Sequence, residues 1–281
     1  MIAQVLTLWT VLTLAGIGGA LSHRAGVLNI ALEGFLLLGA FSMTAADAFG
    51  LNFPLALAFA AAVCTAAGFA WALWSIRSRG NIFILGLGMN LLAAGGITTL
   101  SSVLYGGKGV IQFTRLGAYG HLVLSPWLNL LMVSAAAASA YFLLFRTPAG
   151  IAIRAAGSCP GLLSSRHLNP GRYRITALTA SAALSGIAGA LLALRIGAFV
   201  PNMSANRGWI ALVLVFIGRA HPFGVAAAAL AYSLAEVWTT GLQGSGSAPE
   251  QLVLAFPYFI TAVFLVAVNL LERFGKNRNN S

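Results

Sequence analysis

The chain has 281 residues, of which 59% are hydrophobic and 7% are charged, and its mean hydropathy is +0.89. Soluble domains are about 25% charged, so this composition excludes a soluble domain and predicts a polytopic membrane protein. The formal net charge of +11 does not indicate a nucleic-acid partner, because basic residues in membrane proteins fix topology by collecting on the cytoplasmic side.

Apolar segments of spanning length follow one another along the whole chain. About 20 apolar residues make a transmembrane helix, and this length predicts spans at 3–21, 27–49, 53–75, 82–104, 125–145, 174–196, 222–242 and 251–271. A shorter apolar piece, 208–218, is expected to be a broken helix, which is tolerated inside a bundle. The fold class is therefore all-α, with about eight or nine spans in one domain (1–271) and a cytoplasmic tail (272–281).

The distribution of basic residues predicts the topology. If the loop 146–174 lies inside, four basic residues fall outside or near the outer edge, and the other 12 of the 16 lie on the cytoplasmic side. The four are Lys108, Arg115, Arg195 and Arg207. The N-terminus is then outside and the C-terminus is cytoplasmic. The first apolar run starts at residue 3 without a basic region, so no signal peptide is expected.

The predicted span 27–49 carries Asn29 and Glu33, four residues apart. On a helix these two residues share a face. An acid near the bilayer centre costs roughly 2.5–3.5 kcal/mol and must face protein or water. Two readings of Glu33 stay open. It lines a solute path, or it caps a helix or bonds backbone where a helix is broken.

Two further polar residues lie within predicted spans. Asn90 is in the middle of 82–104, where it either bonds across helices or lines a cavity. Interhelical bonds contribute only about 0.6 kcal/mol on average, which favours the cavity. Glu236 lies in 222–242, and a structural role is favoured for it. Neither Glu33 nor Glu236 has an evident basic partner in the sequence.

The loop 146–174 is the largest polar block on the predicted inner side. Pro160 suits the first turn of a short helix, which would run to about Leu168 before Asn169-Pro170 stops it. On the residues alone, the segment is an ordinary basic connecting loop.

The chain also contains a possible internal repeat. Leu14–Leu21 matches Leu184–Leu191 at six of eight positions. In the predicted topology the two helices run in opposite directions, which would make an inverted repeat of the kind found in transporters. Chance similarity between Gly/Ala-rich helices is the alternative.

Enzyme signatures are missing from the sequence. It has no His-Glu-x-x-His, no Gly-x-Ser-x-Gly and no Walker P-loop, so the chain is not expected to be an enzyme or to bind ATP itself. The four histidines are scattered without ligand spacing, and no metal site is expected.

The stretch Ser22–Gly34 resembles the signature near the start of permease subunits of ATP-binding-cassette importers. The family is that of the branched-chain amino acid, ribose and nucleoside permeases, and the similarity is greatest to its nucleoside/simple-sugar branch. Three further regions agree in order and spacing: Leu85–Leu92, Arg154–Pro160, and Gly208–Arg219 followed by His221–Gly224.

The resemblance implies a multi-pass protein of the bacterial cytoplasmic membrane that works with partners. These are a second permease subunit (a heterodimer is expected, and a homodimer stays open), two cytoplasmic ATPase domains and an extracytoplasmic substrate-binding lipoprotein, besides membrane lipid. ATP and Mg would be bound by the ATPases, which leaves no cofactor in this chain.

The resemblance also implies two groups of site residues. The substrate path would be lined by Asn29, Glu33, Phe35, Met89 and Asn90. A coupling helix that docks on the ATPase would include Gly157, Pro160, Gly161, Leu162, Leu163 and Arg166. The coupling loop departs from the family, which usually has an acid after the proline. No acid occurs between Arg146 and Arg174 in this chain.

The expected function is the translocation path of an ATP-driven importer for a nucleoside-like or other ring-bearing solute: a nucleoside, a flavin such as riboflavin, or a simple sugar. Phe35 stands where the family often has Gln or Met, and an aromatic beside Glu33 would narrow the path or stack on a planar ring. The alternative is a secondary transporter driven by an ion gradient, with Glu33 as the coupling site.

Overall fold

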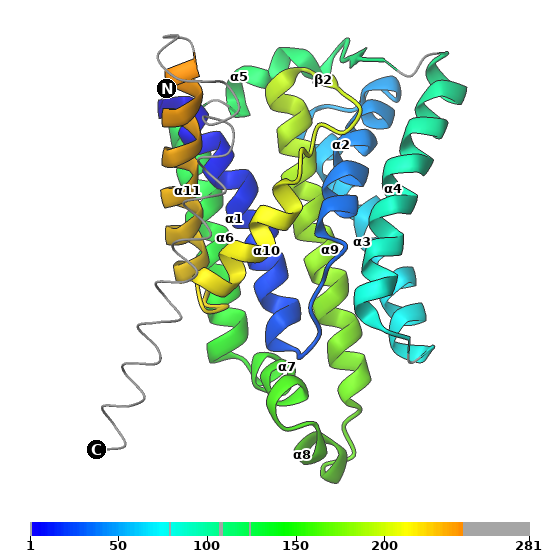
Figure 1. Ribbon diagram of the computed structural model, residues 1–281, viewed down its shortest axis with the longest axis vertical. Coiled ribbons are helices and arrows are strands. Elements are labelled where there is room, and N and C mark those ends of the chain that lie inside the picture. Colours follow the sequence, from blue (N-terminus) through cyan, green and yellow to red (C-terminus); the bar gives the residue numbers. More distant parts are fainter. Residues whose placement is uncertain (1, 79, 107–108, 124, 244–281) are drawn as a thin grey trace.

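The computed structural model describes residues 2–78, 80–106, 109–123 and 125–243. This part of the chain is an all-α bundle with one short pair of strands (Figure 1). Its helices are α1 (Ile2–Arg24), α2 (Leu32–Ala48), α3 (Phe53–Arg77), α4 (Ile82–Tyr105), the 3-10 helix η1 (Leu116–Tyr119), α5 (Gly120–Val123), α6 (Pro126–Arg146), α7 (Pro148–Ser158), α8 (Pro160–Ser165), α9 (Pro170–Ile196), α10 (Arg207–Ile217) and α11 (Pro222–Gln243). The strands β1 (Ile111–Gln112) and β2 (Ala198–Phe199) pair antiparallel.

Local sequence signals mark several helix starts. Asn81, Thr147 and Asn169 accept hydrogen bonds from backbone N–H groups in the first turns of α4, α7 and α9. Side-chain oxygens at this position satisfy donors that have no partner inside the helix. Proline follows directly in α7 and α9, where its missing N–H costs nothing.

The predicted spans correspond to α1, α3, α4, α6, α9 and α11. Five of these (α1, α3, α4, α6 and α9) are long and apolar enough to cross a membrane. The span expected at 27–49 is wrong at its start, because α2 begins only at Leu32. The expected span 251–271 and the tail 272–281 lie outside the described residues.

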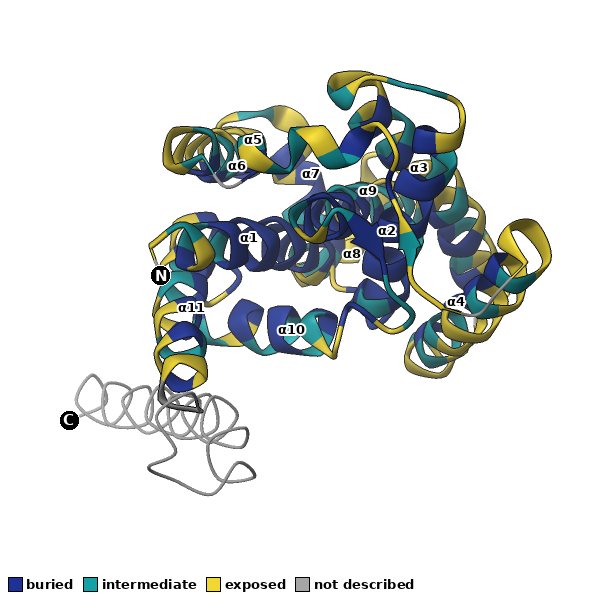
Figure 2. Cartoon of the chain, turned by 90° about the horizontal axis from the view of Figure 1, so that it is seen from above, coloured by how far each residue is buried: buried dark blue, intermediate teal, exposed yellow. Residues whose placement is uncertain are grey.

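Helices α1 and α9 form the centre of the bundle. Viewed from above, α1 is almost entirely buried and α9 is largely buried in its apolar part, whereas α4 and α6 lie at the edge and are largely exposed (Figure 2). Small residues allow the central backbones to approach closely. A Cβ atom on Gly189 of α9 would collide with the Leu36 carbonyl of α2. Large apolar side chains such as Leu91 and Trp127 are exposed on the outer helices, as a membrane environment requires.

The two central helices, α1 and α9, are followed by similar segments. Helix α1 descends in Figure 1 and is followed by a non-helical stretch and the short α2; α9 ascends and is followed by a non-helical stretch and the short α10. Helix α2 packs on α9, and α10 packs on α1. An inverted repeat of Leu14–Leu21 and Leu184–Leu191, one of the two readings of that match, would produce an arrangement of this kind.

Candidate functional site

The chain is non-helical between α1 and α2, and again between β2 and α10. The first break begins at Gly26, which has φ of +78°, a conformation that glycine adopts without strain. A Cβ atom on Gly26 would also lie only 2.7 Å from the Cα atom of Gly157 in α7. Asn29 lies inside this break, so it does not share a helical face with Glu33 as the sequence predicted.

Asn29 is fully buried and bonds to the broken backbone. Its Oδ1 accepts a hydrogen bond from the Ala31 N–H (3.0 Å), and its Nδ2 donates to Ser181 Oγ on α9 (2.9 Å). The Asn29 N–H donates to Ser22 Oγ (3.3 Å). Sequence reasoning missed both serines, because nothing in their local pattern indicates a long-range partner.

Asn90 supports the same break from α4. Its Nδ2 donates to the Ile30 carbonyl (2.9 Å), and its Oδ1 accepts from the Gly34 N–H (2.8 Å). Backbone groups in lipid must find partners inside the protein. Asn90 therefore bonds across helices, and with Asn29 it makes the broken start of α2 tolerable at membrane depth.

Glu33 lies in the first turn of α2 and caps α10. Its Oε1 accepts from the Asn206 N–H (2.9 Å), and its Oε2 accepts from the Gly208 N–H (2.6 Å). Asn206 itself makes no side-chain cap. A carboxylate is stabilised at a helix N-terminus, where the helix dipole is positive. The geometry matches the second reading of Glu33, an acid that bonds backbone at a broken helix.

A salt bridge joins α10 to α11 beside this cap. Arg207 Nη2 lies 3.2 Å from Glu236 Oε1, and the two side chains are 20% and 23% exposed. The expectation that Glu236 has no basic partner is therefore wrong. The two residues belong to different helices, so no sequence spacing reveals the pair. We use the name polar junction for Glu33, Asn206, Arg207, Gly208 and Glu236.

The remaining predicted path residues face the protein interior in part or in full. Phe35 is 0% exposed, and its ring meets the edge of Trp71 with centroids 5.9 Å apart. Met89 is half-buried and packs against the group of buried apolar side chains that includes Phe35 and Trp71. The structure thus brings Asn29, Glu33 and Asn90 together around the break, whereas Phe35 lies in the core with no exposed surface.

The predicted coupling residues form a two-helix projection at one end of the bundle (Figure 1). Pro160 starts α8 as expected, although α8 ends at Ser165 rather than near Leu168. Leu163 is buried against Ala152 and Ala156 of α7, while Leu162 is 57% exposed. The side chain of Arg166 is also exposed, as is Gly161. Gly157 faces the backbone of the first break, as described above.

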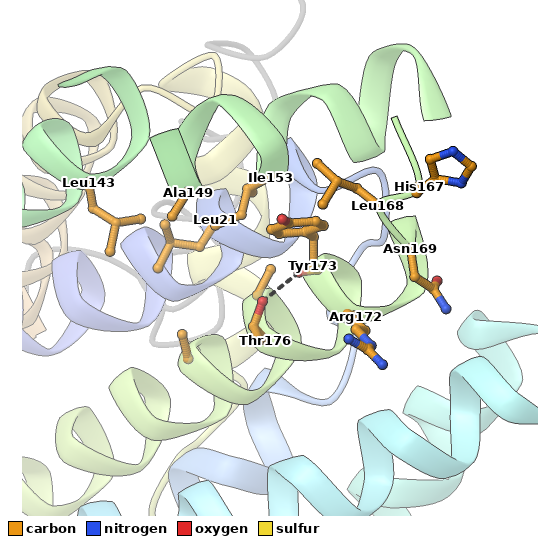
Figure 3. A pocket seen from close by; sticks show the side chains of 12 residues that line it. Leu21, Leu143, Ala149, Ile153, His167, Leu168, Asn169, Arg172, Tyr173 and Thr176 are labelled. Atoms are coloured by element: carbon orange, nitrogen blue, oxygen red, sulfur yellow. Dashed lines mark hydrogen bonds between the residues drawn. The ribbon is translucent and has the colours of Figure 1, made fainter. Parts of the chain in front are cut away.

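A cavity of about 630 Å³ lies beside this projection. It is lined by residues from α1, α6, α7 and α9, and by the segment that joins α8 to α9. Figure 3 shows apolar side chains such as Leu143 and Ile153 among its lining, with Tyr173 from α9 beside Ile153. His167 and Asn169 lie at its polar end. Among the described residues, no group of three or more His, Cys, Asp or Glu side chains could hold a metal ion.

At the opposite end of the bundle, Asp47 holds the connection between α4 and α5. Its carboxylate accepts hydrogen bonds from the Thr114 N–H (2.7 Å), the Thr114 hydroxyl (2.9 Å), the Arg115 N–H (2.9 Å) and the Leu116 N–H (2.7 Å). The strand pairing of Ile111 with Phe199 joins the same connection to the segment before α10. Sequence reasoning missed this clamp.

Comparison with known proteins identifies the class. The family model described as branched-chain amino acid transport system / permease component matches residues 1–268, and the chain belongs to this family. It is a multi-pass membrane permease subunit of the ATP-binding-cassette importer type. No significant match among solved structures was found.

Three of the relatives carry the names of transporter permeases. The guanosine ABC transporter permease protein NupQ of Bacillus subtilis is 27% identical over 90% of this chain and 87% of NupQ. The nucleoside ABC transporter permease protein NupC of Lactococcus lactis is 27% identical over 94% of this chain and 90% of NupC. A Haloferax volcanii protein with only a provisional name as a glucose ABC transporter permease, TsgC13, is 32% identical over 76% of this chain and 68% of its own length.

Proposed function

We propose that this chain forms part of the translocation path of an ATP-driven importer for nucleosides. The observation that carries the proposal is the polar junction, where the carboxylate of Glu33 on α2 bonds the start of α10. The chain is also similar, over about nine tenths of its length, to permeases named for guanosine and nucleosides. Phe35 is buried, so the case for a ring-bearing solute rests on these relatives and not on ring stacking. A simple sugar is the next candidate.

The contacts provide a route from the coupling helices to the junction. Helices α7 and α8 dock on an ATPase through exposed groups such as Leu162 and Arg166. Movement of α7 reaches the first break through the Gly157–Gly26 contact. It then reaches α10 through the carboxylate of Glu33, which joins the two half-helices.

The proposal includes the partners and the orientation. A second permease subunit, expected to be a different chain, completes the path. Two cytoplasmic ATPase domains bind ATP and Mg and hydrolyse the ATP, and an extracytoplasmic lipoprotein delivers the solute. The end that carries α7 and α8 is cytoplasmic, because Arg146, Arg154 and Arg166 lie there. The N-terminus is then outside, and the C-terminal tail is cytoplasmic.

The test is ATPase activity of the purified complex in lipid, with a loaded and an empty binding protein. Guanosine, riboflavin, ribose and glucose are compared. We expect guanosine to stimulate hydrolysis most and to be taken up. Stimulation by a sugar alone would contradict the nucleoside assignment. If no ATPase co-purifies and the lone chain moves solute down an ion gradient, the alternative of a secondary transporter with Glu33 as coupling site replaces this proposal.

A further inference from the structure

Arg77 and Arg172, at the α7/α8 end of the bundle, have no protein partner in the part of the chain that the structure describes. Arg77 ends α3, and Arg172 lies in the first turn of α9. Neither side chain makes a hydrogen bond or an ion pair with any residue that the structure describes. Arg24 and Arg174, at the same end, do. Arg24 donates to the Ala220 and Arg219 carbonyls, and Arg174 donates to the Ala156 carbonyl.

Arg77 and Arg172 line one groove between α3 and α9. Its volume is about 740 Å³, and its other lining side chains include Phe69, Leu73 and Ile175. Phe69 precedes Arg77 by eight residues, so the groove extends about 12 Å from the charged end along the span. Arg172 also lines the neighbouring cavity, and Figure 3 shows its side chain on the side of α9 away from Leu143 and Ala149. The groove therefore has a cationic mouth and an apolar wall.

No residue lining this groove is acidic. The positive-inside rule accounts for arginines at this end, but it does not require two of them to line one apolar groove without a counter-ion. Guanidinium groups bind phosphate with charge-assisted hydrogen bonds, and basic pockets between transmembrane helices bind anionic lipid head groups. Leu162 and Arg166, the exposed coupling residues of α8, do not line the groove.

We propose that this groove binds an anionic phospholipid. The phosphate lies between Arg77 and Arg172, and an acyl chain lies along Leu73, Phe69 and Ile175. The site depends only on the chain being a membrane protein. The proposal therefore holds whichever solute the protein transports.

The test is native mass spectrometry of the purified complex, with dioleoylphosphatidylglycerol added and dioleoylphosphatidylcholine as the neutral comparison. We expect a phosphatidylglycerol adduct on the wild-type complex. Arg77→Gln and Arg172→Gln should each weaken its apparent affinity about fivefold. Arg172→Lys should keep most of the affinity, because it keeps the charge. Arg146→Gln is the matched control, since Arg146 is exposed at the same end but does not line the groove.

Several results would overturn the proposal. One is equal retention of the two lipids by the wild-type complex. Another is an equal loss of phosphatidylglycerol in the Arg146 and Arg172 variants, which would indicate only a general charge effect. Competition by free glycerol phosphate would assign the site to a soluble phosphate. Loss of the ATPase from the Arg172→Gln complex, with lipid retention unchanged, would assign the groove to the partner protein.

Discussion

Side chains in the centre of the bundle replace hydrogen bonds that helices lose where they are broken. Asn29 and Asn90 do this for the first break, and Glu33 does it for the start of α10. An unsatisfied buried donor or acceptor costs about 1–3 kcal/mol. Three of the five residues that the family resemblance placed on a solute path are therefore also part of the scaffold.

Replacing Glu33 with Gln should lower stability, because the amide keeps one acceptor oxygen for the two N–H groups of Asn206 and Gly208. We expect a loss of about 1–3 kcal/mol, and a fall in melting temperature of about 2–10 °C. The measurement is size-exclusion of the detergent-solubilised complex after heating. Glu33→Asp, which keeps the charge, is the control. Wild-type stability with lost uptake would instead favour Glu33 as a residue of the solute path.

Gly208 should tolerate no side chain. A Cβ atom there would collide with the backbone of Glu33, and overpacking typically costs 1–3 kcal/mol. We expect Gly208→Ala to reduce the yield of folded complex and to lower uptake severalfold. Gly88→Ala is the matched control, because Gly88 on α4 has open space around it. Equal behaviour of the two variants would show that the close approach of α10 to α2 is not needed.

At the scale of elements, α10 is a half-helix held at its start by two neighbours. Glu33 of α2 bonds its first N–H groups, and Glu236 of α11 pairs with Arg207. Together these contacts fix where the chain crosses the centre of the bundle before it turns into α11 (Figure 1).

The Arg207–Glu236 pair should show coupling in a double-mutant cycle. Glu236→Gln leaves the Arg207 charge uncompensated, and Arg207→Gln does the same to Glu236. We expect each single variant to lose about 1–3 kcal/mol and the double variant to lose less than the sum. Thermal stability of the four complexes measures this. Additive losses would mean that the pair contributes nothing beyond its separate residues.

Much of the order and extent of the helices could be predicted from the sequence. Apolar length indicates the spans, and Pro160 and Asn169-Pro170 mark the ends of the α8 region. The late start of α2 could not be predicted, because 27–31 is apolar except for Asn29 and continues the pattern of a span. At the break, Gly26 has a positive φ and lies against Gly157, a long-range contact that the local sequence does not reveal. Likewise, the capping role of Glu33 requires the position of α10, which lies 173 residues further along the chain.

At the scale of the whole molecule, native cysteines can test the orientation. Cys159 is exposed between α7 and α8, and Cys64 is buried. A membrane-impermeant maleimide should label Cys159 in permeabilised cells but not in intact spheroplasts, and Cys159→Ser should abolish the labelling. Labelling of Cys159 from the outside would invert the proposed topology.

The strand pair at the other end of the molecule limits the freedom of the loop that contains it. Asp47 fixes residues 114–116 to the end of α2, and β1 is paired with β2, which precedes α10. The hydrogen bonds of Asp47 and the β1–β2 pairing connect this loop to both α2 and the segment before α10, so a force applied to this end of the bundle reaches α2 and α10 together.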